Sequence, residues 1–383
     1  MTLPELRSNE ELRRHEFPVA RDKIFLAHAG VCPLPRRVSE AIRDYASRCA
    51  QGDQESLLPA LQLRHTRELA GRLLNARPEE IAFVGPTSLA LSFVAAGLPW
   101  KRNDNVLIYF DDYPANVYPW MALAQRGVEV RFLSTREPGR ISPLDVLGQA
   151  DEQTRLVALA SCHFVSGYRL GLDAIGQTLH QRNILFCVDG IQTLGAFPTT
   201  VEHVDFLAAD AHKWLLGPCA AGILYVRASL QEQLRPTVFG WHNVWCPDYL
   251  AQEELVLRAD ARRYEAGTQN LLGLVGLHAA LELLAGIGLD NIAAELLRQR
   301  TLLVPALKNK GYTVLHADAP PAHAGGIVTF YRDGADMAGL CERLEAANVI
   351  VSLRTDRSGR KYIRFSPHFY NTEAEIQRAV ELL

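Results

Sequence analysis

The sequence predicts an α/β protein with a large domain, built on a mostly parallel sheet, and a smaller α+β domain at the C-terminal end. From Ile24 onward, short apolar runs rich in β-branched residues alternate with longer amphipathic stretches, which favours strand–helix units. The runs are almost continuously apolar, as in strands that helices cover on both faces. A length of 383 residues is too great for one ordinary core and favours two or three domains.

The elements follow in order from this pattern. Residues 1–20 are charged and compatible with helix, and we expect them to form an N-terminal arm packed on the rest. Strands are expected at 81–85, 105–110, 128–133, 155–161, 184–189, 204–210 and 222–227, with helices at 88–97, 119–126 and 173–182. A long helix is expected at 271–288, followed by strands within 325–331 and 361–366. We therefore predict a large domain at 21–265 and a small domain at 266–383, which includes the long linking helix.

Composition excludes several classes of function. With 40 basic and 43 acidic residues the net charge is −3, so no overall field favours nucleic acid or an anionic membrane. The seven cysteines are scattered without a CxxC pair or a zinc-site spacing, which predicts reduced thiols and no metal. The N-terminal segment lacks the apolar core of a signal peptide, and no run of about 18 apolar residues occurs. We expect a cytoplasmic protein.

Two polar residues follow neighbouring strands of the predicted sheet. Asp189 ends the run ILFCVD, and Lys213 follows the run VDFLAAD. Ligands of open α/β sheets bind at the carboxyl ends of the strands. Pyridoxal 5′-phosphate (PLP) needs a lysine amine for its Schiff base and a carboxylate against its pyridine nitrogen. The pair fits PLP, although each residue alone also fits a strand-end turn or a surface lysine.

A phosphate group needs its own binding site. The string FVGPTSLALSFVAAG reads as a strand, a Gly-Pro turn and a helix that begins with Thr87 and Ser88. Hydroxyl groups and free backbone N–H groups at a helix N-terminus bind a dianion well, although an ordinary helix cap has the same pattern. The sequence contains neither a GK[ST] nor a GxGxxG motif, so it does not indicate a nucleotide-binding site.

The chain resembles the class V aminotransferase group of fold-type I PLP enzymes, which includes cysteine desulfurases, selenocysteine lyase, isopenicillin N epimerase and kynureninase. The resemblance extends from FLAHAGVCPLP at 25–35 to IRFSPHFYNT at 363–372. Its most specific parts are VDGIQTLGA…AADAHKWLLGP at 188–218 and RYEAGTQNLLGLVGL at 263–277.

This resemblance implies a role for each matching residue. Lys213 would form the Schiff base and move protons, Asp189 would pair with the pyridinium nitrogen, and Gln192 would bond the ring hydroxyl. Thr87, Ser88 and His212 would hold the phosphate, and Tyr113 would stack on the cofactor with Asn116 beside it. Gly267 and Thr268 would reach the partner's phosphate in a homodimer. Arg364 would bind the α-carboxylate of a small amino-acid substrate, and His28 and Gly30 would border the substrate site. Tyr113, Asn116, Arg364 and His28 also fit ordinary structural roles.

The chain departs from this group in three places. Desulfurases carry a nucleophilic cysteine shortly before the carboxylate-binding arginine, but residues 349–367 contain none, and Cys341 lies earlier in an expected helix. Asp210 stands where a small hydroxyl residue usually contacts the phosphate, so we expect it to face elsewhere or to receive donors of its own. His163 stands where relatives often carry an amide, and could act on the ring oxygen or the substrate, or be structural.

The resemblance leaves three reactions open, because one cofactor supports many different reactions. Closeness to the desulfurases and lyases, together with the cysteine-free segment, favours a lyase that cleaves a Cβ–S or related bond without a persulfide cysteine. The alternatives are aminotransfer, with Lys213 moving the Cα proton, and epimerisation, with Tyr113 or His163 as a second acid. A degenerate, non-catalytic member is disfavoured because Lys213, Asp189 and the phosphate site are all present.

Overall fold

The computed structural model describes all 383 residues and contains a large sheet of seven strands. In the order β2-β8-β7-β6-β5-β3-β4, all neighbours pair in parallel except β8, which is antiparallel to β2 and β7. The predicted mostly parallel sheet is confirmed. The strands are β2 (Ile81–Phe83), β3 (Asn105–Ile108), β4 (Glu129–Phe132), β5 (Thr154–Ala160), β6 (Leu185–Asp189), β7 (Phe206–Ala209) and β8 (Ile223–Val226).

The nearly unbroken apolar runs reflect a sheet that is covered on both faces. In β3, Leu107 packs into one hydrophobic cluster, whereas Val106 and Ile108 pack into another. Because successive strand residues point to opposite faces, each face needs its own apolar residues. The edge strand β4 is instead partly exposed, and its sequence EVRF contains charged residues.

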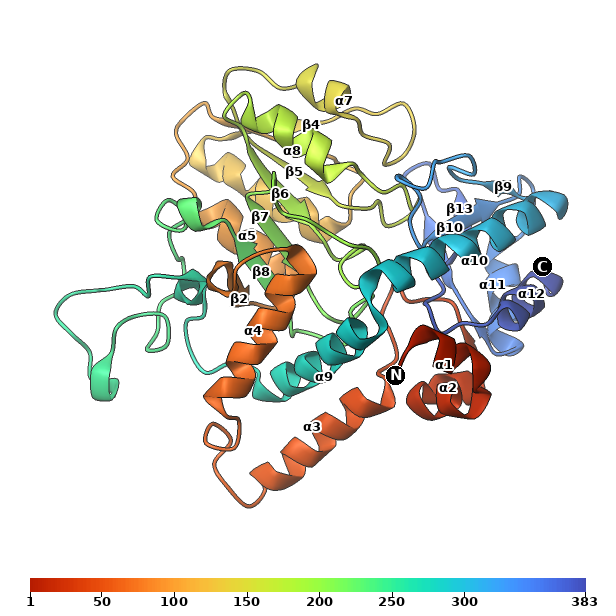
Figure 1. The fold of residues 1–383 in the computed structure, drawn as a ribbon. Helices are drawn as coiled ribbons and strands as arrows, with labels where there is room; N and C mark the ends of the chain where they lie inside the picture. The colour runs from red at the N-terminus through yellow and green to blue at the C-terminus, as the bar shows by residue number, and fades with distance from the viewer.

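Helices cover this sheet, as Figure 1 shows. The helices of this part are α3 (Arg36–Cys49), α4 (Ala60–Leu74), α5 (Thr87–Gly97), α6 (Tyr118–Met121), α7 (Pro143–Leu147), α8 (Leu172–His180) and α9 (Leu271–Ile287). Short 3-10 helices are η1 (Pro18–Arg21), η2 (Pro78–Glu80), η3 (Pro114–Asn116), η4 (Ala122–Arg126), η5 (Ala228–Leu230), η6 (Pro247–Tyr249) and η7 (Ala261–Tyr264). The helix expected at 119–126 is thus one α-helical turn continued by a 3-10 helix.

A second, antiparallel sheet lies in the C-terminal part, in the order β12-β13-β10-β9. Its strands are β9 (Thr313–Val314), β10 (Val328–Tyr331), β12 (Ser352–Thr355) and β13 (Lys361–Phe365). The helices of this part are α10 (Leu289–Asn309), α11 (Met337–Ala346) and α12 (Glu373–Glu381). Together with this sheet they enclose a separate hydrophobic cluster, which makes this the expected α+β part.

The N-terminal arm is helical and packs on the C-terminal end of the chain, where α1 (Leu3–Ser8) and α2 (Glu10–Glu16) lie beside α12 in Figure 1. The Phe17 ring stacks on Tyr370 with centroids 4.0 Å apart. Arg13 pairs with Glu375 at 2.9 Å. The arm therefore ties the two ends of the chain together.

Segments that are far apart in the sequence also pack together. Strand β1 (Ile24–Phe25) pairs in parallel with β11 (Val349–Ile350), far along the sequence. Helix α9 packs closely against α3 and α4. The division into domains at residue 265 stays a prediction. No single helix has the length and apolar composition to cross a membrane, although the bent pair α9 and α10 passes that test by length and composition alone.

Candidate active site

A cavity of about 350 Å³ lies at the carboxyl ends of the large-sheet strands, where the small sheet meets them. β2 and β7 run in the same direction because β8 is antiparallel to both, so their ends share one edge with those of β3 and β6. Nine residues predicted from the sequence line this cavity: Gly30, Thr87, Ser88, Tyr113, Asp189, Gln192, His212, Lys213 and Arg364.

Asp189 and Lys213 face this cavity from adjacent strands. The Asp189 side chain is buried and accepts one hydrogen bond, from the backbone N–H of Ile191 at 3.0 Å. Burial raises the pKa of Asp189, whereas that hydrogen bond and the nearby charge of Lys213 lower it. A buried carboxylate with spare acceptor capacity is suited to bind a protonated ring nitrogen.

Lys213 is 7% exposed, and its Nζ lies 5.2 Å from the centroid of the Tyr113 ring. Burial lowers the pKa of the Lys213 amine to about 8, and the Asp189 charge opposes that shift. An amine with this pKa is partly neutral near physiological pH, the state in which it attacks a carbonyl carbon. The aromatic ring of Tyr113 provides a flat surface beside it.

The N-terminus of α5 lies at this cavity, where an anion site is expected. Thr87 and Ser88 are its first residues, and the first N–H groups of a helix have no intrahelical acceptor. Gly85 allows the approach of the neighbouring loop, because a Cβ at this position would lie 2.6 Å from the backbone carbon of Ala220. This cavity edge therefore offers hydroxyls and N–H groups to a phosphate.

Asp210 is turned away from that anion site by donors of its own, as expected. Its carboxylate accepts backbone hydrogen bonds from Ala211, Ala220 and Ala221 at 2.9–3.0 Å. His212 donates from Nδ1 to the same carboxylate at 2.8 Å, which leaves its Nε2 toward the cavity. The carboxylate thus orients the imidazole, so that its other ring nitrogen is available to a group in the cavity.

Gln192 is held by two hydrogen bonds. Its Nε2 donates to the Ala29 carbonyl at 3.1 Å, and its Oε1 accepts from Trp214 Nε1 at 2.9 Å. One amide hydrogen is still available to a group in the cavity. The side chain is therefore fixed in an orientation that can donate to a ring oxygen.

Two arginines enter the cavity from the small sheet. Arg364 is 1% exposed, and its Nη1 donates to the Phe164 carbonyl at 2.6 Å, whereas its Nε is buried without a partner. The sequence reasoning missed Arg354, which lines the same cavity. The sequence could have indicated Arg354. This residue and Arg364 lie on two strands joined by a short turn, and the side chains of a strand alternate between its two faces.

Five predicted residues do not line the cavity: Asn116, His28, His163, Gly267 and Thr268. Asn116 is buried beneath it, where its Nδ2 donates to Asp112 and its Oδ1 accepts from Trp120. His28 is fully buried, with Nδ1 bonded to the Ser366 carbonyl and Nε2 to the Tyr370 hydroxyl. The expectation that His28 borders the substrate site has no support in this geometry.

His163 points into a different cavity, behind Phe164. Its Nδ1 accepts from the Ser166 backbone N–H at 3.1 Å, so its Nε2 carries the proton and donates to the Asp111 carbonyl at 3.0 Å. Burial lowers the pKa of His163 to about 4. Both ring nitrogens are engaged, and the geometry therefore favours the structural interpretation of His163 over the catalytic one.

Besides Asp189, the site contains another buried acid, Asp112, which the sequence reasoning missed. Its Oδ2 accepts from the Ala160 backbone N–H at 2.9 Å and from Asn116 Nδ2 at 3.1 Å. Burial raises the pKa of Asp112 to about 7, and the charge of Asp189 adds to that shift. No sequence signal distinguished it from its neighbours, because its burial depends on the packing of β3 against β5.

Gly267 and Thr268 line another cavity, next to the start of α5, which includes Phe83, Gly85 and Leu89. The Thr268 hydroxyl donates to Glu55 at 3.1 Å. Neither residue reaches the cavity around Lys213 within one chain. The cysteines are also absent from the lining of that cavity.

The donor set around Lys213 fits PLP. An amine of lowered pKa, a buried carboxylate, a flat aromatic ring, an amide donor and a helix N-terminus with two hydroxyls surround one space. The buried Nε of Arg364 also calls for an acceptor that the chain itself does not supply. These groups match the aldehyde, pyridine nitrogen, ring face, hydroxyl and phosphate of the cofactor.

Comparisons with known proteins show the family of this chain. The model of the family "Aminotransferase class-V" matches residues 24–379. A probable cysteine desulfurase of Methanothermobacter thermautotrophicus is 29% identical over 394 residues, covering 98% of this chain and 97% of the relative. The uncharacterized aminotransferase YcbU of Bacillus subtilis is 28% identical, covering 97% of this chain and 96% of its own.

Solved structures share the fold. The apo cysteine desulfurase of Thermococcus onnurineus NA1 has a TM-score of 0.87 and 22% identity, covering 97% of this chain and 96% of that one. The cystine C-S lyase C-DES, in complex with its reaction product cysteine persulfide, has a TM-score of 0.86 and 23% identity, covering 95% of this chain and 98% of that one. The predicted fold is confirmed.

Proposed function

Because this chain belongs to the class-V aminotransferase family of PLP-dependent enzymes, we propose that it cleaves the Cβ–S or a related Cβ–X bond of a small α-amino acid. The observation that carries the proposal is the composition of the cavity around Lys213. It contains a base, an acid and arginines, but none of the chain's cysteines. A lyase needs the first three groups and does not need a protein thiol.

The cofactor would be held by residues from several strand ends. Thr87, Ser88 and His212 would bind its phosphate, Asp189 its ring nitrogen, and Gln192 its hydroxyl. Bound in this way, PLP supplies a sink for the electron pair released when a bond to Cα breaks. The Asp189 carboxylate would keep the ring nitrogen protonated, which that sink requires.

The side chains around the substrate would orient it and move its proton. Arg364 would bind the α-carboxylate with two parallel N–H groups, which fixes the orientation of Cα. Lys213 would remove the Cα proton as a neutral amine and, as an ammonium, donate it to the departing sulfur. Tyr113 would cover the other side of the cavity and exclude water from it.

The overall reaction balances with one water molecule. The Cα proton leaves to Lys213, the Cβ–S bond breaks with its electron pair on sulfur, and the sulfur group departs as a thiol. The remaining three carbons and nitrogen hydrolyse to pyruvate and ammonium. No oxidant or reductant is required.

The sulfur would leave on the departing group and not on the protein. Cys341 lies on α11 in the small-sheet part, and burial raises the pKa of its thiol. Burial also raises the pKa of Cys32, the cysteine next to the cavity residue Val31, to about 12. Neither thiol is activated as a nucleophile. The name of C-DES, a cystine C-S lyase, is consistent with such a route.

A second candidate is aminotransfer, which the name of the B. subtilis relative favours. In that reaction Lys213 would return the proton to the cofactor carbon next to the ring. Epimerisation would need a second acid on the face opposite Lys213. Of the two candidates for this acid, Tyr113 lines the cavity around Lys213, whereas His163 lines a different cavity.

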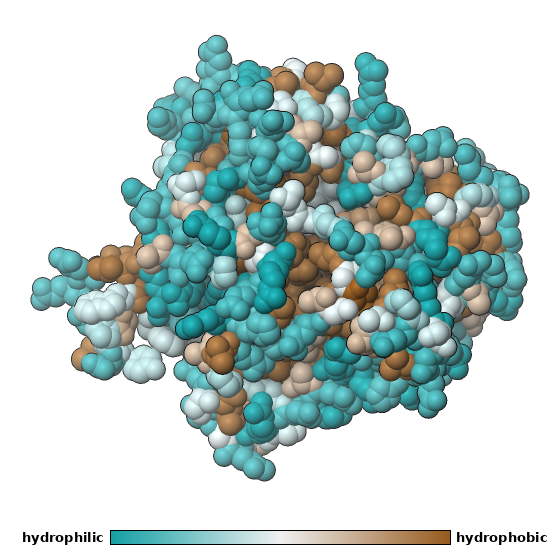
Figure 2. Space-filling model, in the orientation of Figure 1, coloured by the Kyte–Doolittle hydropathy of each residue, from teal (hydrophilic) through white to brown (hydrophobic).

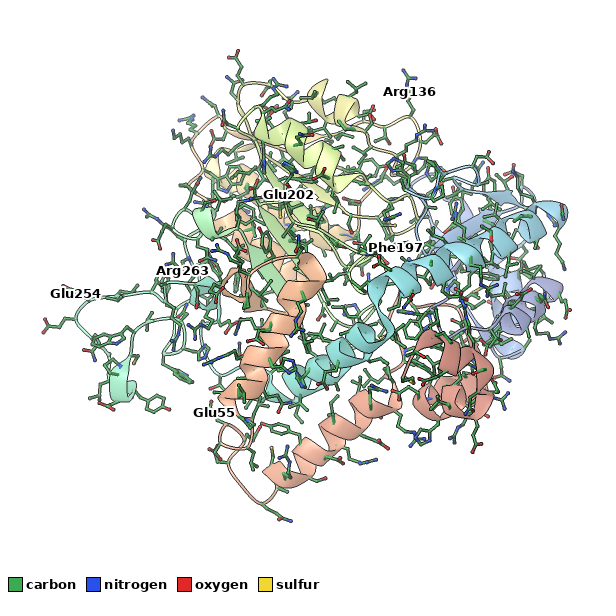
Figure 3. All side chains as sticks on the ribbon, viewed as in Figure 1. Glu55, Arg136, Phe197, Glu202, Glu254 and Arg263 are labelled. Carbon is green, nitrogen blue, oxygen red and sulfur yellow. The ribbon has the colours of Figure 1, made fainter.

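We also propose that the enzyme acts as a homodimer. Residues 240–258 form an arm that projects from the body in Figure 1, with Glu254 at its outer side in Figure 3. Figure 2 shows hydrophobic residues on this arm, and the exposed ones are Trp245, Tyr249, Leu250, Leu255 and Val256. An exposed apolar surface of this kind is typical of an interface. Such a dimer would place Gly267 and Thr268 next to the partner's phosphate site.

A cytoplasmic location stays a prediction.

The test is to incubate the purified holoenzyme with L-cysteine, L-cystine and L-alanine and to follow three products. Pyruvate with ammonium and a sulfur product supports the lyase, and a keto acid that forms only with an acceptor supports aminotransfer. Loss of optical activity alone supports epimerisation. Lys213→Ala is the inactive control, and Cys341→Ser should retain full sulfur release. If Cys341→Ser abolished it, a persulfide route would replace the proposal.

A further inference from the structure

Three potential metal ligands meet between helices α4 and α9, which pack against each other (Figure 1). His65 lies on α4, whereas His278 and Glu282 lie four residues apart on α9 and so share one face of that helix. One ligand atom from each of the three side chains lies within 4.8 Å of the other two. The two imidazole rings meet edge to face, with centroids 5.3 Å apart. None of the three residues lines the cavity around Lys213.

The Thr66 hydroxyl determines which nitrogen of His278 carries the proton. Its Oγ1 lies 2.7 Å from the Gln62 carbonyl oxygen and 3.0 Å from His278 Nδ1. A hydroxyl has one hydrogen, and the carbonyl can only accept it, so His278 Nδ1–H is the donor of the second bond. Thr66 is buried, which protects this arrangement from water. The other ring nitrogen, Nε2, is therefore left with a free lone pair.

This free nitrogen faces a carboxylate. His278 Nε2 lies 3.6 Å from Glu282 Oε1, the only ion-pair contact of Glu282. A protonated ring would approach a carboxylate to about 2.7–2.9 Å, so the longer distance does not correspond to a charged hydrogen bond. Two ligands of a tetrahedral zinc ion, each bonded at about 2.0–2.2 Å, lie roughly 3.3–3.6 Å apart. The spacing of the two atoms therefore fits two ligands of one ion.

The burial of the ligands also suits an ion that enters from solvent. The Glu282 side chain is 50% exposed, whereas that of His278 is 14% exposed and held by Thr66. A ligand that a hydrogen bond has already oriented loses little freedom when it binds a metal. The carboxylate can then close over the ion from the open side.

A second cluster in the chain lacks this arrangement. Asp173, Glu202 and His203 also lie close enough to share an ion. However, His203 Nδ1 lies 2.6 Å from Asp173 Oδ1, so these two groups already satisfy each other through a hydrogen bond. Both acids of this cluster are exposed. It carries no proposal and serves as a control.

We propose that His65, His278 and Glu282 bind one zinc ion between α4 and α9, with the fourth position open to water. Two imidazoles and one carboxylate are a ligand set that zinc accepts in tetrahedral geometry. The ion would tie α4 to α9 and stabilise their packing. The scattered cysteines take no part, and a spacing rule along the sequence does not detect a site that forms between two distant helices. The proposal is independent of the proposed lyase reaction.

The experiment uses holoenzyme without an affinity tag, because a histidine tag would itself bind zinc. The protein is treated with EDTA, dialysed and titrated with Zn²⁺ in a calorimeter, and elemental analysis then gives the zinc retained after gel filtration. We expect one equivalent per chain. Because the ion binds the folded state, Zn²⁺ should also raise the midpoint of thermal unfolding.

Four variants locate the ion. Glu282→Gln keeps the shape of an exposed side chain and removes its charge, and it should weaken zinc binding about 100-fold, as should His278→Ala. Thr66→Val leaves all three ligands in place but removes the hydroxyl that orients His278, and it should weaken binding by about 10-fold or more. The matched control His203→Ala should bind zinc like the wild type. Circular dichroism and the visible absorbance of bound PLP show that each variant is folded and loaded.

The outcomes separate this site from others. Loss of the zinc equivalent in Glu282→Gln and His278→Ala, but not in His203→Ala, supports the proposal. Absence of both binding heat and thermal stabilisation at millimolar Zn²⁺ overturns it. Binding that Glu282→Gln and His278→Ala leave intact also overturns it, because the ion then lies elsewhere, on thiols or on the second cluster. Pyruvate formation plays no part in these measurements, so failure of the proposed lyase would be seen separately.

Discussion

The Nζ of Lys213 lies 5.2 Å from the centroid of the Tyr113 ring. The two residues follow different strands, β7 and β3, and meet only because the carboxyl ends of these strands share one edge of the sheet. The amine and the flat ring thus face the same cavity from different sides. A planar cofactor that is attached to the amine can stack on the ring.

The first prediction concerns the pH dependence of cofactor attachment. Only the neutral amine of Lys213 attacks the aldehyde, and burial lowers its pKa to about 8. The rate at which cofactor-free protein takes up PLP should therefore rise about tenfold per pH unit below pH 8 and level off above it. Stopped-flow absorbance measures this rate. A profile that is still rising near pH 10 would contradict the lowered pKa, and Lys213→Ala should form no covalent complex.

The second prediction concerns Asp112. Its pKa is raised to about 7, mainly by burial, so its folded-state pKa exceeds the unfolded value of 3.8. Its contribution to stability is present at low pH and is lost as the pH rises through about 7. Asp112→Asn can keep both hydrogen bonds through its amide oxygen and cannot ionise. The variant should gain stability relative to wild type between pH 5 and pH 8, by up to a few kcal/mol. Urea unfolding at both pH values measures the free energy of unfolding of the variant and of the wild type. A difference between them that does not change with pH would contradict the raised pKa of Asp112.

The third prediction concerns Asp210. Asp210→Ala removes the acceptor of three backbone N–H groups and releases His212. Two of these donors, those of Ala211 and Ala221, are buried, and each costs about 1–3 kcal/mol when left without a partner. We expect a large loss of stability in chemical unfolding and weaker PLP binding, with a smaller loss in Asp210→Asn.

The pH dependence of Asp210 has the opposite sign to that of Asp112. Burial opposes its ionisation, but the hydrogen bonds from His212 and Ala220 outweigh burial and lower the pKa of Asp210. Its stabilising contribution is therefore present above the unfolded pKa and is lost as the pH falls below about 4. Wild type and Asp210→Asn should converge in stability at that acidic end. A constant gap down to pH 3 would contradict the assignment.

The fourth prediction tests the dimer. A Cβ at Gly267 would meet nothing within 4 Å in one chain, so Gly267→Leu should leave the fold of a single chain intact. In the proposed dimer the new side chain would face the partner's phosphate site. We expect weaker PLP binding and a larger dimer dissociation constant in sedimentation. As a control, Gly286→Ala adds a side chain at an exposed position of α9, where the nearest atom would lie 3.8 Å from the new Cβ, and should change neither. A Gly267→Leu protein identical to wild type would argue against a shared site.

Much of the fold was predictable because its signals are local. Continuous apolar runs mark strands with two covered faces, as the opposite packing of Val106 and Leu107 illustrates. The positions of Asp189 and Lys213 after two such runs were enough to predict that they face one cavity. The helix that begins at Thr87 was predicted from its Gly-Pro turn.

The site residues that were missed or misplaced depend on contacts between distant segments. His163 follows a strand end like the others, but the turn back to Ser166 directs its ring into another cavity. Asp112 is buried where β3 packs against β5, and its partner Ala160 is a residue of β5. No local pattern reports such contacts.

The sequence alone determined the strand ends and hence the placement of Lys213, Asp189 and Thr87 at one edge, because burial on two faces leaves a signature in each segment. The tertiary structure decided which side chains share the cavity. Arg354 joins Arg364 there only through the β12–β13 register, and the Asp210 carboxylate accepts a hydrogen bond from a loop ten residues away. Register and loop approach are set by packing between segments, which the order of residues within any one segment does not reveal.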